Sequence, residues 1–301
     1  MGPDPMRTPS NLVIDAALGL ATLAGRAWML FPPKSGVSIS RNLPYGPAGR
    51  HRLDVYTPTE PRGVHVLFIH GGSFRTCSKE SHTYVGRTLA AAGIHVYAID
   101  YGLAPEFPYP TAHEDGLLAW RWLTQGRARE GVVATAGDSA GANVALSIAV
   151  ACLGGFGDVP AARDLRTPDA VLSLSGLLRV RGSAQAYQDN AIAHARLAQI
   201  ETDFLGPLRD APLAEPLDAI EAGGPWLDAL PPVFIAVGDE DGIARDSHAL
   251  DRALQGRKAT LHTYPEQGHA FMISPFREAS ARCWADAVAF FDRFLGGGSD
   301  T

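Results

Sequence analysis

Short continuous apolar runs, rich in Val and Ile, alternate along the chain with longer segments whose apolar residues recur every three or four positions. The short runs predict strands, and the longer segments predict helices. Because a run that is apolar at every position is buried on both faces, the alternation predicts an α/β fold with a mostly parallel central sheet and helices on both faces. The predicted strands are 52–57, 64–70, 94–100, 132–137, 170–176, 233–238 and 260–265.

The middle of the chain departs from this alternation. Residues 179–231 carry helical patches and several prolines but no convincing strand. We interpret the segment as an insertion over the carboxyl ends of the strands, where the ligand sites of such sheets are found. An ordinary long crossover connection is the alternative.

The N-terminus holds a second unusual segment. Residues 11–31 are largely apolar and are followed by Pro32 and Pro33, which end a helix. Polar residues, among them Asp15 and Arg26, recur at a spacing that forms one narrow stripe on such a helix. We interpret the segment as a helix over an apolar pocket, and a membrane anchor or export signal is left open. The sequence thus predicts a single domain, 1–301, in which this helix and the segment 179–231 together form a cap.

Composition narrows the classes of function. Of the 301 residues, 46% are hydrophobic, which is enough for one large core. The net charge is −6 and no basic cluster stands out, which argues against nucleic-acid binding. Cys77, Cys152 and Cys283 match no metal spacing and are expected to be buried thiols of a reduced, cytoplasmic protein. The cysteines therefore suggest no zinc or iron site.

A glycine-rich loop follows the predicted strand 64–70. It contains Gly71 and Gly72, and glycines let the backbone approach a ligand so closely that several N–H groups converge on one point. Beside a nucleophilic serine, the N–H groups of Gly71, Gly72 and Ala140 would form an oxyanion hole. A glycine turn that merely ends a strand is the alternative.

The predicted strand 132–137 leads into the pattern G-x-S-x-G and then a predicted helix. This pattern places a serine on a sharp strand-to-helix turn, which makes Ser139 a candidate nucleophile. So short a pattern also arises by chance, and a serine needs a base to react. We expect the neighbouring Asp138 to be structural and to accept hydrogen bonds near the site.

Candidate partners of Ser139 follow two later strands. Asp239 and Asp241 come after strand 233–238, and His269 comes after strand 260–265. The order serine, acid, histidine is the order along the chain in the α/β-hydrolase architecture. His70 is a rival base, although its place at the glycine loop better suits a hydrogen-bonding support role.

Taken together, several segments resemble the hormone-sensitive-lipase-like, or bacterial type IV, carboxylesterases of the α/β-hydrolase family. HGGSF resembles the oxyanion loop HGGGF of that family, and GDSAGA resembles its nucleophile motif GDSAGG. DYGLAPEFPYPTAHEDGLLAWRWL, residues 100–123, resembles the stretch before the nucleophile strand. GDEDGIARDS and GHAF resemble the acid and histidine loops. These segments span most of residues 43–295.

The resemblance implies a fold, a site and an activity. The implied fold is the α/β-hydrolase fold with a helical cap, which matches residues of about 1–40 and 180–225. Ser139 matches the nucleophile, His269 the base that later acts as an acid, and Asp241 the triad acid, with Asp239 as the fallback. Ser73 replaces the third glycine of the family loop, and Gly102, Phe107 and Ala142 are further departures. Together these departures affect pocket shape and local hydrogen bonding and remove no catalytic group.

The implied function is a serine carboxylesterase acting on short- to medium-chain esters without a cofactor. An amidase or formamidase of the same fold, similar to the kynurenine formamidases, would use the same residues and is one alternative. A non-catalytic small-molecule-binding homologue is the other. The plant gibberellin receptors resemble this family but lack the catalytic histidine, whereas His269 is present here. The sequence leaves a homodimer open.

Overall fold

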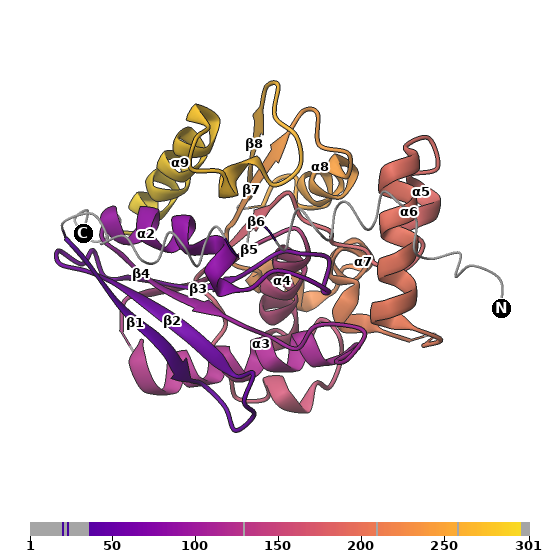
Figure 1. The fold of residues 1–301 in the computed structure, drawn as a ribbon. Coiled ribbons are helices and arrows are strands. Elements are labelled where there is room, and N and C mark those ends of the chain that lie inside the picture. Colours follow the sequence, from indigo (N-terminus) through magenta and orange to yellow (C-terminus); the bar gives the residue numbers. More distant parts are fainter. Residues whose placement is uncertain are drawn as a thin grey trace.

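The computed structural model describes residues 36–295 apart from 129, 209 and 258, together with Leu20 and Leu23. Within this part of the chain, one eight-stranded sheet has the order β1-β2-β4-β3-β5-β6-β7-β8 (Figure 1). Its strands are β1 (Val37–Pro44), β2 (Arg52–Pro58), β3 (Val64–Ile69), β4 (Ile94–Ile99), β5 (Val132–Asp138), β6 (Ala170–Leu174), β7 (Val233–Gly238) and β8 (Ala259–Tyr264).

The strands are mostly parallel, as predicted. β2 runs antiparallel to both of its neighbours, and the pairs from β4 through β3, β5, β6 and β7 to β8 are parallel. In β3, Val66 and Phe68 are buried in the core on one face, while Leu67 and Ile69 are buried in the core on the other. Because both faces are covered, the apolar residues of the central strands run without a break.

Helices cover both faces of the sheet (Figure 1). α2 (Thr83–Ala91) and α9 (Glu278–Leu295) pack in the core on one face. α3 (Thr111–Trp122), α4 (Ala140–Cys152) and α8 (Ala244–Ala253) contribute to the cores on the other. Nearly all of α4 is buried, which fits its position beneath the centre of the sheet. Short turns complete the fold: η1 (Lys79–His82), η2 (Leu123–Arg127), η3 (Pro160–Ala162), η5 (Pro212–Ala214), η6 (Pro225–Ala229) and η7 (Phe271–Ile273).

The predicted strands are confirmed, but β1 was missed. Its sequence, VSISRNLP, has no continuous apolar run because the strand lies at the edge of the sheet and most of its side chains are exposed or half-buried. Residues 37–40, which the prediction assigned to the cap, therefore belong to the sheet.

The predicted helix at 11–31 lies outside the described residues, apart from Leu20 and Leu23, which are helical.

Within the predicted cap range 180–225, one part stands apart from the body of the fold and is called the cap below. It consists of α5 (Ser183–Ala186), α6 (Ala191–Ile200) and the following turn η4 (Glu201–Leu205), which stand beside the sheet in Figure 1. α7 (Pro216–Ala222) lies in the predicted range 180–225 but packs on α4 and α8 in the body of the fold. The apolar side chains of Leu217 and Ile220 account for this, since both are buried there.

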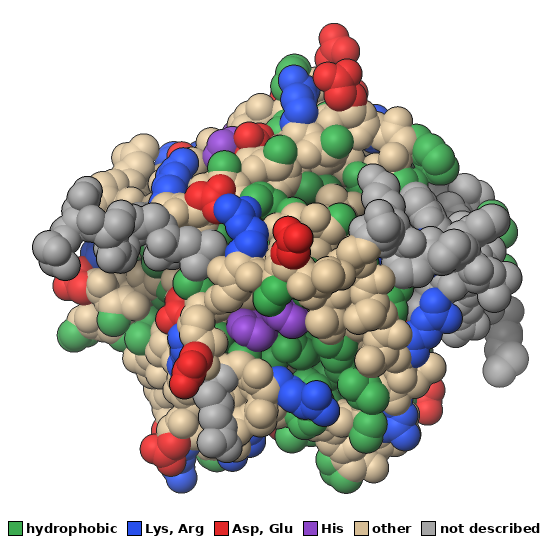
Figure 2. All heavy atoms as spheres, turned by 90° about the vertical axis from the view of Figure 1, so that its left-hand side faces the viewer, with side chains coloured by type: hydrophobic (Ala, Val, Ile, Leu, Met, Phe, Trp, Pro, Cys, Tyr) green, Lys and Arg blue, Asp and Glu red, His purple; other side chains and the backbone are tan. Residues whose placement is uncertain are grey.

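Two further observations concern the surface charge and the length of the helices in the described part of the chain. In the view of Figure 2, the described Lys and Arg side chains are scattered among acidic and apolar ones rather than gathered in one patch. Among the described residues, no helix has both the length and the apolar character needed to cross a membrane.

Candidate active site

Ser139 occupies the sharp turn between β5 and α4. Its φ of 52° and ψ of −117° lie in a region that non-glycine residues rarely adopt. The N–H of Ser139 donates to the carbonyl of Leu174 at the end of β6, at 2.9 Å. This strained turn projects the side chain from the carboxyl end of the sheet, at the N-terminus of a helix whose dipole favours negative charge.

Two glycines allow this turn to form. A Cβ on Gly137 would lie 2.3 Å from the carbonyl carbon of Gly141, and a Cβ on Gly141 would lie 2.0 Å from the carbonyl oxygen of Ile69. Both distances are far below van der Waals contact, so β5, α4 and β3 meet backbone to backbone. The G-x-S-x-G pattern is thus required by packing on both sides of the serine.

Ser139, His269 and Asp241 form a continuous hydrogen-bonded chain. The Nε2 atom of His269 lies 3.0 Å from Oγ of Ser139. On the other side of the ring, Nδ1 lies 3.0 Å from Oδ1 and 3.1 Å from Oδ2 of Asp241. Nucleophile, base and orienting acid are therefore within direct hydrogen-bonding reach of one another.

The electrostatics of the pair suit a general base. The carboxylate of Asp241 is fully buried, and burial raises its pKa, but the His269 imidazole and the N–H of Ile243 at 2.9 Å outweigh this and lower the pKa overall. Burial lowers the pKa of His269, and the Asp241 carboxylate more than reverses this, so the pKa ends above 6.5. The His269 side chain remains 39% exposed and lines the cavity beside Ser139.

The two rival residues lie elsewhere. Asp239 is exposed, and its N–H donates to the carbonyl of Tyr264 at 3.1 Å. His70 is buried, stacks on Tyr101 with ring centroids 4.3 Å apart, and has Nδ1 2.6 Å from the carbonyl oxygen of Gly71. Burial lowers the pKa of His70 to about 3, so its ring supports the glycine loop as a neutral group.

Gly71 does not have the role predicted from the sequence. Its N–H donates to Oδ1 of Asp138 at 3.0 Å, so it is engaged in holding the loop against the nucleophile turn. A Cβ on Gly71 would lie 2.3 Å from Oδ2 of the same carboxylate. Gly71 is therefore a structural glycine, while Gly72, Ser73 and Cys77 of the same loop line the cavity beside Ser139.

Known proteins match the chain over the segments that form this site. A family described as having the alpha/beta hydrolase fold matches residues 66–273, which contain the whole triad. This chain belongs to the α/β-hydrolase-fold family. The resemblance inferred from the motifs is thereby confirmed.

Curated relatives in this family carry hydrolase names. An acetyl-hydrolase of Streptomyces hygroscopicus is 34% identical over 71% of this chain and 70% of that protein. Esterase LipI of Mycobacterium tuberculosis is 38% identical over 79% of this chain and 77% of that protein. The carboxylesterase/phospholipase LipF of the same species is 29% identical over 85% of this chain and 68% of that protein.

Solved structures share the α/β-hydrolase fold at lower identity. A Pyrobaculum calidifontis esterase superposes with a TM-score of 0.77 at 23% identity, covering 97% of this chain and 95% of that one. A hormone-sensitive lipase from a metagenome library gives a TM-score of 0.74 at 23% identity, covering 94% of this chain and 91% of that one. Both matches extend over nearly the whole length of the chain.

In this α/β-hydrolase-fold chain the triad opens into a cavity of about 440 Å³. Ser139 and His269 lie on its sheet side, and α6 supplies a further part of its lining, including Arg196. The guanidinium of Arg196 is buried, and its Nε donates to Oγ of Ser73 at 3.0 Å. The apolar lining residues are Leu177, Ile192, Ala193, Leu197, Ile200, Ile243, Ala270 and Ile273.

Sequence reasoning missed the polar support beneath the glycine loop. Nε2 of the buried His82 lies 3.0 Å from Oδ1 of Asp138, so this carboxylate faces both His82 and the N–H of Gly71. Burial lowers the pKa of His82, and the Asp138 carboxylate raises it by more. Asp138 is thus structural, as predicted, but nothing in the local sequence pattern marks His82 as its partner.

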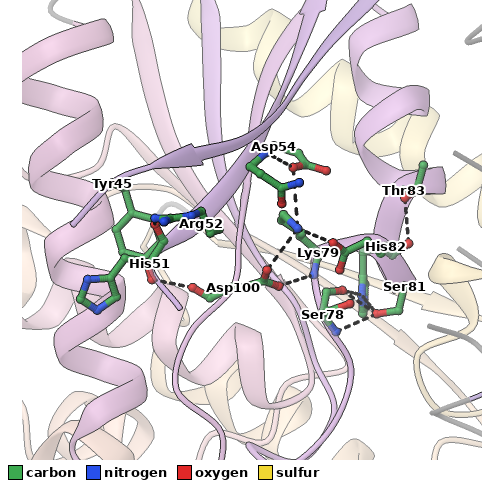
Figure 3. Close-up of polar contacts among 12 residues, drawn as sticks. Tyr45, His51, Arg52, Asp54, Ser78, Lys79, Ser81, His82, Thr83 and Asp100 are labelled. Atoms are coloured by element: carbon green, nitrogen blue, oxygen red, sulfur yellow. Dashed lines mark hydrogen bonds and ion pairs between the residues drawn. The ribbon is translucent and has the colours of Figure 1, made fainter. Parts of the chain in front are cut away.

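A buried lysine fixes the turn that carries His82 (Figure 3). Lys79 is 2% exposed, and its Nζ lies 3.2 Å from Oδ2 of Asp100 and 3.8 Å from Oδ1 of Asp54. It also pairs with Glu80, and its N–H donates to Oδ1 of Asp100 at 2.9 Å. These contacts hold η1 against β2 and β4, and thereby place His82 under Asp138.

The cysteines take no part in a metal site within the described chain. Cys283 is buried, as predicted, whereas Cys77 and Cys152 are only half-buried, and all three are free thiols. Among the described residues, no group of three His, Cys, Asp or Glu side chains gathers where it could hold a metal ion.

Proposed function

We propose that this protein is a serine carboxylesterase that hydrolyses short- to medium-chain carboxylic esters through an acyl-enzyme. The observation that carries the proposal is the chain of contacts from Ser139 through His269 to Asp241, which opens into a largely apolar cavity. The names of the curated relatives, an acetyl-hydrolase, a carboxylesterase/phospholipase and an esterase, support the same reaction class.

The first half-reaction acylates the serine. Oγ of Ser139 attacks the ester carbonyl while Nε2 of His269 takes its proton, and Asp241 holds the opposite ring nitrogen and stabilises the imidazolium. His269 then gives the proton to the departing alkoxide, so an alcohol leaves and the acyl group stays on Oγ. Water repeats the sequence with His269 as base, which releases the carboxylic acid and restores the serine.

The negative charge on the tetrahedral intermediate needs fixed donors. Ala140 is the first residue of α4, and the first N–H groups of a helix have no partner within it. We assign this N–H, with those of Gly72 and Ser73, to the oxyanion hole, because Gly72 and Ser73 line the cavity beside Ser139. Each such donor is worth roughly 10²–10³ in kcat.

The cavity supports a small substrate. At about 440 Å³ it lies toward the lower end of the roughly 300–1,000 Å³ typical of small-molecule sites. Its apolar lining favours an alkyl acyl group over a charged one. The cytoplasmic location, the homodimer and the independence from a cofactor stay predictions of the sequence.

The test uses p-nitrophenyl esters of graded acyl length and the matching anilides. We expect wild-type protein to cleave the acetate and butyrate esters faster than the hexadecanoate ester and faster than the anilides. Ser139→Ala should abolish the activity and the labelling by an alkyl fluorophosphonate while leaving thermal melting nearly unchanged. Ser147→Ala, which removes a hydroxyl from the same helix away from the cavity, should stay active. Faster cleavage of the anilides, or an active Ser139→Ala protein, would contradict the proposal.

A further inference from the structure

The glycine loop, residues 70–77, has an unusual backbone. Ser73, Phe74 and Cys77 have φ values of 60°, 59° and 71°, in the left-handed region, where side chains are strained. Gly72 also has a positive φ, of 111°. Strained conformations of this kind persist only where the surrounding structure holds them.

Three consecutive residues of this loop contact the cap segment, residues 191–205, which consists of α6 and η4. Oγ of Ser73 accepts a hydrogen bond from Nε of Arg196 at 3.0 Å. The ring of Phe74 stacks on Phe204, with centroids 3.9 Å apart and planes 2° from parallel. Nε of Arg75 lies 2.9 Å from a carboxylate oxygen of Asp203.

These contacts combine three kinds of interaction. Both stacked rings are fully buried, so their contact is protected from solvent, and the ion pair beside them is largely buried. Arg196 is anchored within α6 through its NH1 group, which donates to Oε1 of Gln199 at 3.3 Å. The cap segment therefore contacts the loop through side chains that are mostly buried, which fixes the position of the two segments relative to each other.

The contact between Ser73 and Arg196 bears most directly on catalysis. A glycine would adopt the backbone of position 73 without strain, so the serine is the less favourable residue for the backbone alone. The Ser73 hydroxyl accepts a hydrogen bond from the Arg196 guanidinium. The backbone N–H of Ser73 is among the donors assigned to the oxyanion hole. A shift of Ser73 would thus misalign a donor without touching Ser139 or His269.

We propose that the cap segment holds the glycine loop in its catalytic conformation and that Arg196, through Ser73, is a positioning residue for the oxyanion hole. The proposal rests on the esterase function proposed above. It assigns the cap a part in the chemical step in addition to its part in enclosing the substrate. The hydrogen bonds from the oxyanion-hole N–H groups to the substrate oxygen are stronger in the transition state than in the ground state. A misaligned donor should therefore lower kcat more than it raises KM.

A double-mutant cycle tests the proposal with p-nitrophenyl acetate as substrate. Arg196→Met and Ser73→Ala each remove one partner, and Ser73→Ala keeps a Cβ at the strained position. We expect each to lower kcat roughly 10- to 100-fold with little change in KM, less than the loss of a whole donor. The double variant should be no slower than the slower single variant, because both changes remove the same interaction.

Two further variants separate positioning from folding. Arg196→Lys keeps a donor and should recover part of kcat, while Thr202→Ala breaks a hydrogen bond inside the cap segment and should leave kcat unchanged. Multiplicative losses in the double variant, or a rise in KM alone, would overturn the proposal while esterase activity stands. Wild-type protein that cleaves no ester would overturn the proposed function and this proposal together.

Discussion

The carboxylate of Asp138 accepts a hydrogen bond from the N–H of Gly71 at 3.0 Å, so the residue that precedes the nucleophile also holds the loop that faces it. The same oxygen lies 3.0 Å from Nε2 of His82. One buried side chain thus connects η1, the glycine loop and the nucleophile turn.

Removal of the Asp138 carboxylate should displace the glycine loop. We expect Asp138→Ala to lower kcat roughly 10- to 100-fold, because the loop supplies donors to the oxyanion hole. The buried N–H of Gly71 loses its acceptor, which costs roughly 1–3 kcal/mol of unfolding free energy. Asp169→Ala is the control, since Asp169 binds the N–H of Val133 at the opposite end of β5. Its kcat should stay at the wild-type value, and equal losses in the two variants would argue against a role at the site.

The triad acid can be identified by two asparagine substitutions. Asp241→Asn should lower kcat on the order of 10⁴-fold, because the amide no longer holds the required tautomer of His269. Asp239→Asn should leave kcat unchanged, because Asp239 is exposed and its N–H points to the carbonyl of Tyr264. Steady-state kinetics with p-nitrophenyl butyrate would check both. A larger loss at position 239 would transfer the acid role to that residue.

The pH dependence of kcat/KM follows from the protonation of His269. The base must be neutral to accept the serine proton, and the Asp241 carboxylate raises its pKa above 6.5 against the opposing effect of burial. Activity should therefore fall as the pH decreases through a midpoint above 6.5, by about tenfold per pH unit well below it. Initial rates from about pH 5 to about pH 9 would locate the midpoint. A midpoint at or below 6.5 would be inconsistent with the observed pairing.

Lys79 should be essential for stability. Lys79→Met leaves the carboxylates of Asp54 and Asp100 without their cation, and such a loss from a buried pair costs roughly 3–5 kcal/mol of unfolding free energy. Urea titration followed by circular dichroism would measure it. Arg163→Met is the control, because its pair with Asp158 lies in solvent and its removal should leave the urea midpoint in place. Equal midpoints for both variants would show that the buried lysine contributes little.

The triad could be located from the sequence because of the sheet topology. Parallel strands bring their carboxyl ends to one edge, so Ser139, Asp241 and His269, each just beyond a predicted strand, had to lie near one another. Their order along the chain then identified the roles. Asp241 could be preferred over Asp239 only through the family resemblance, and the structure places the carboxylate of Asp241, not that of Asp239, beside His269.

Features that depend on backbone direction or long-range contact could not be predicted. The sequence reveals the two glycines at 71 and 72, but it does not reveal that the N–H of Gly71 donates to the carboxylate of Asp138. The contact of Ser73 with Arg196 joins residues 123 positions apart, and no periodicity in either segment indicates it. β1 escaped prediction for a simpler reason, since an exposed edge strand needs few apolar residues.

Gly137 and Gly141 let the nucleophile turn pack through its backbone, so the position of Ser139 depends on no side chain that a substrate would touch. Substitutions along the apolar wall of α6, such as at Ile192 or Ile200, can therefore change which ester enters while the reactive atom stays in place. The wall that selects the substrate and the turn that holds the nucleophile are therefore separate parts of this chain. Arg196 is the exception, because it lines the cavity and also donates a hydrogen bond to Ser73 of the glycine loop.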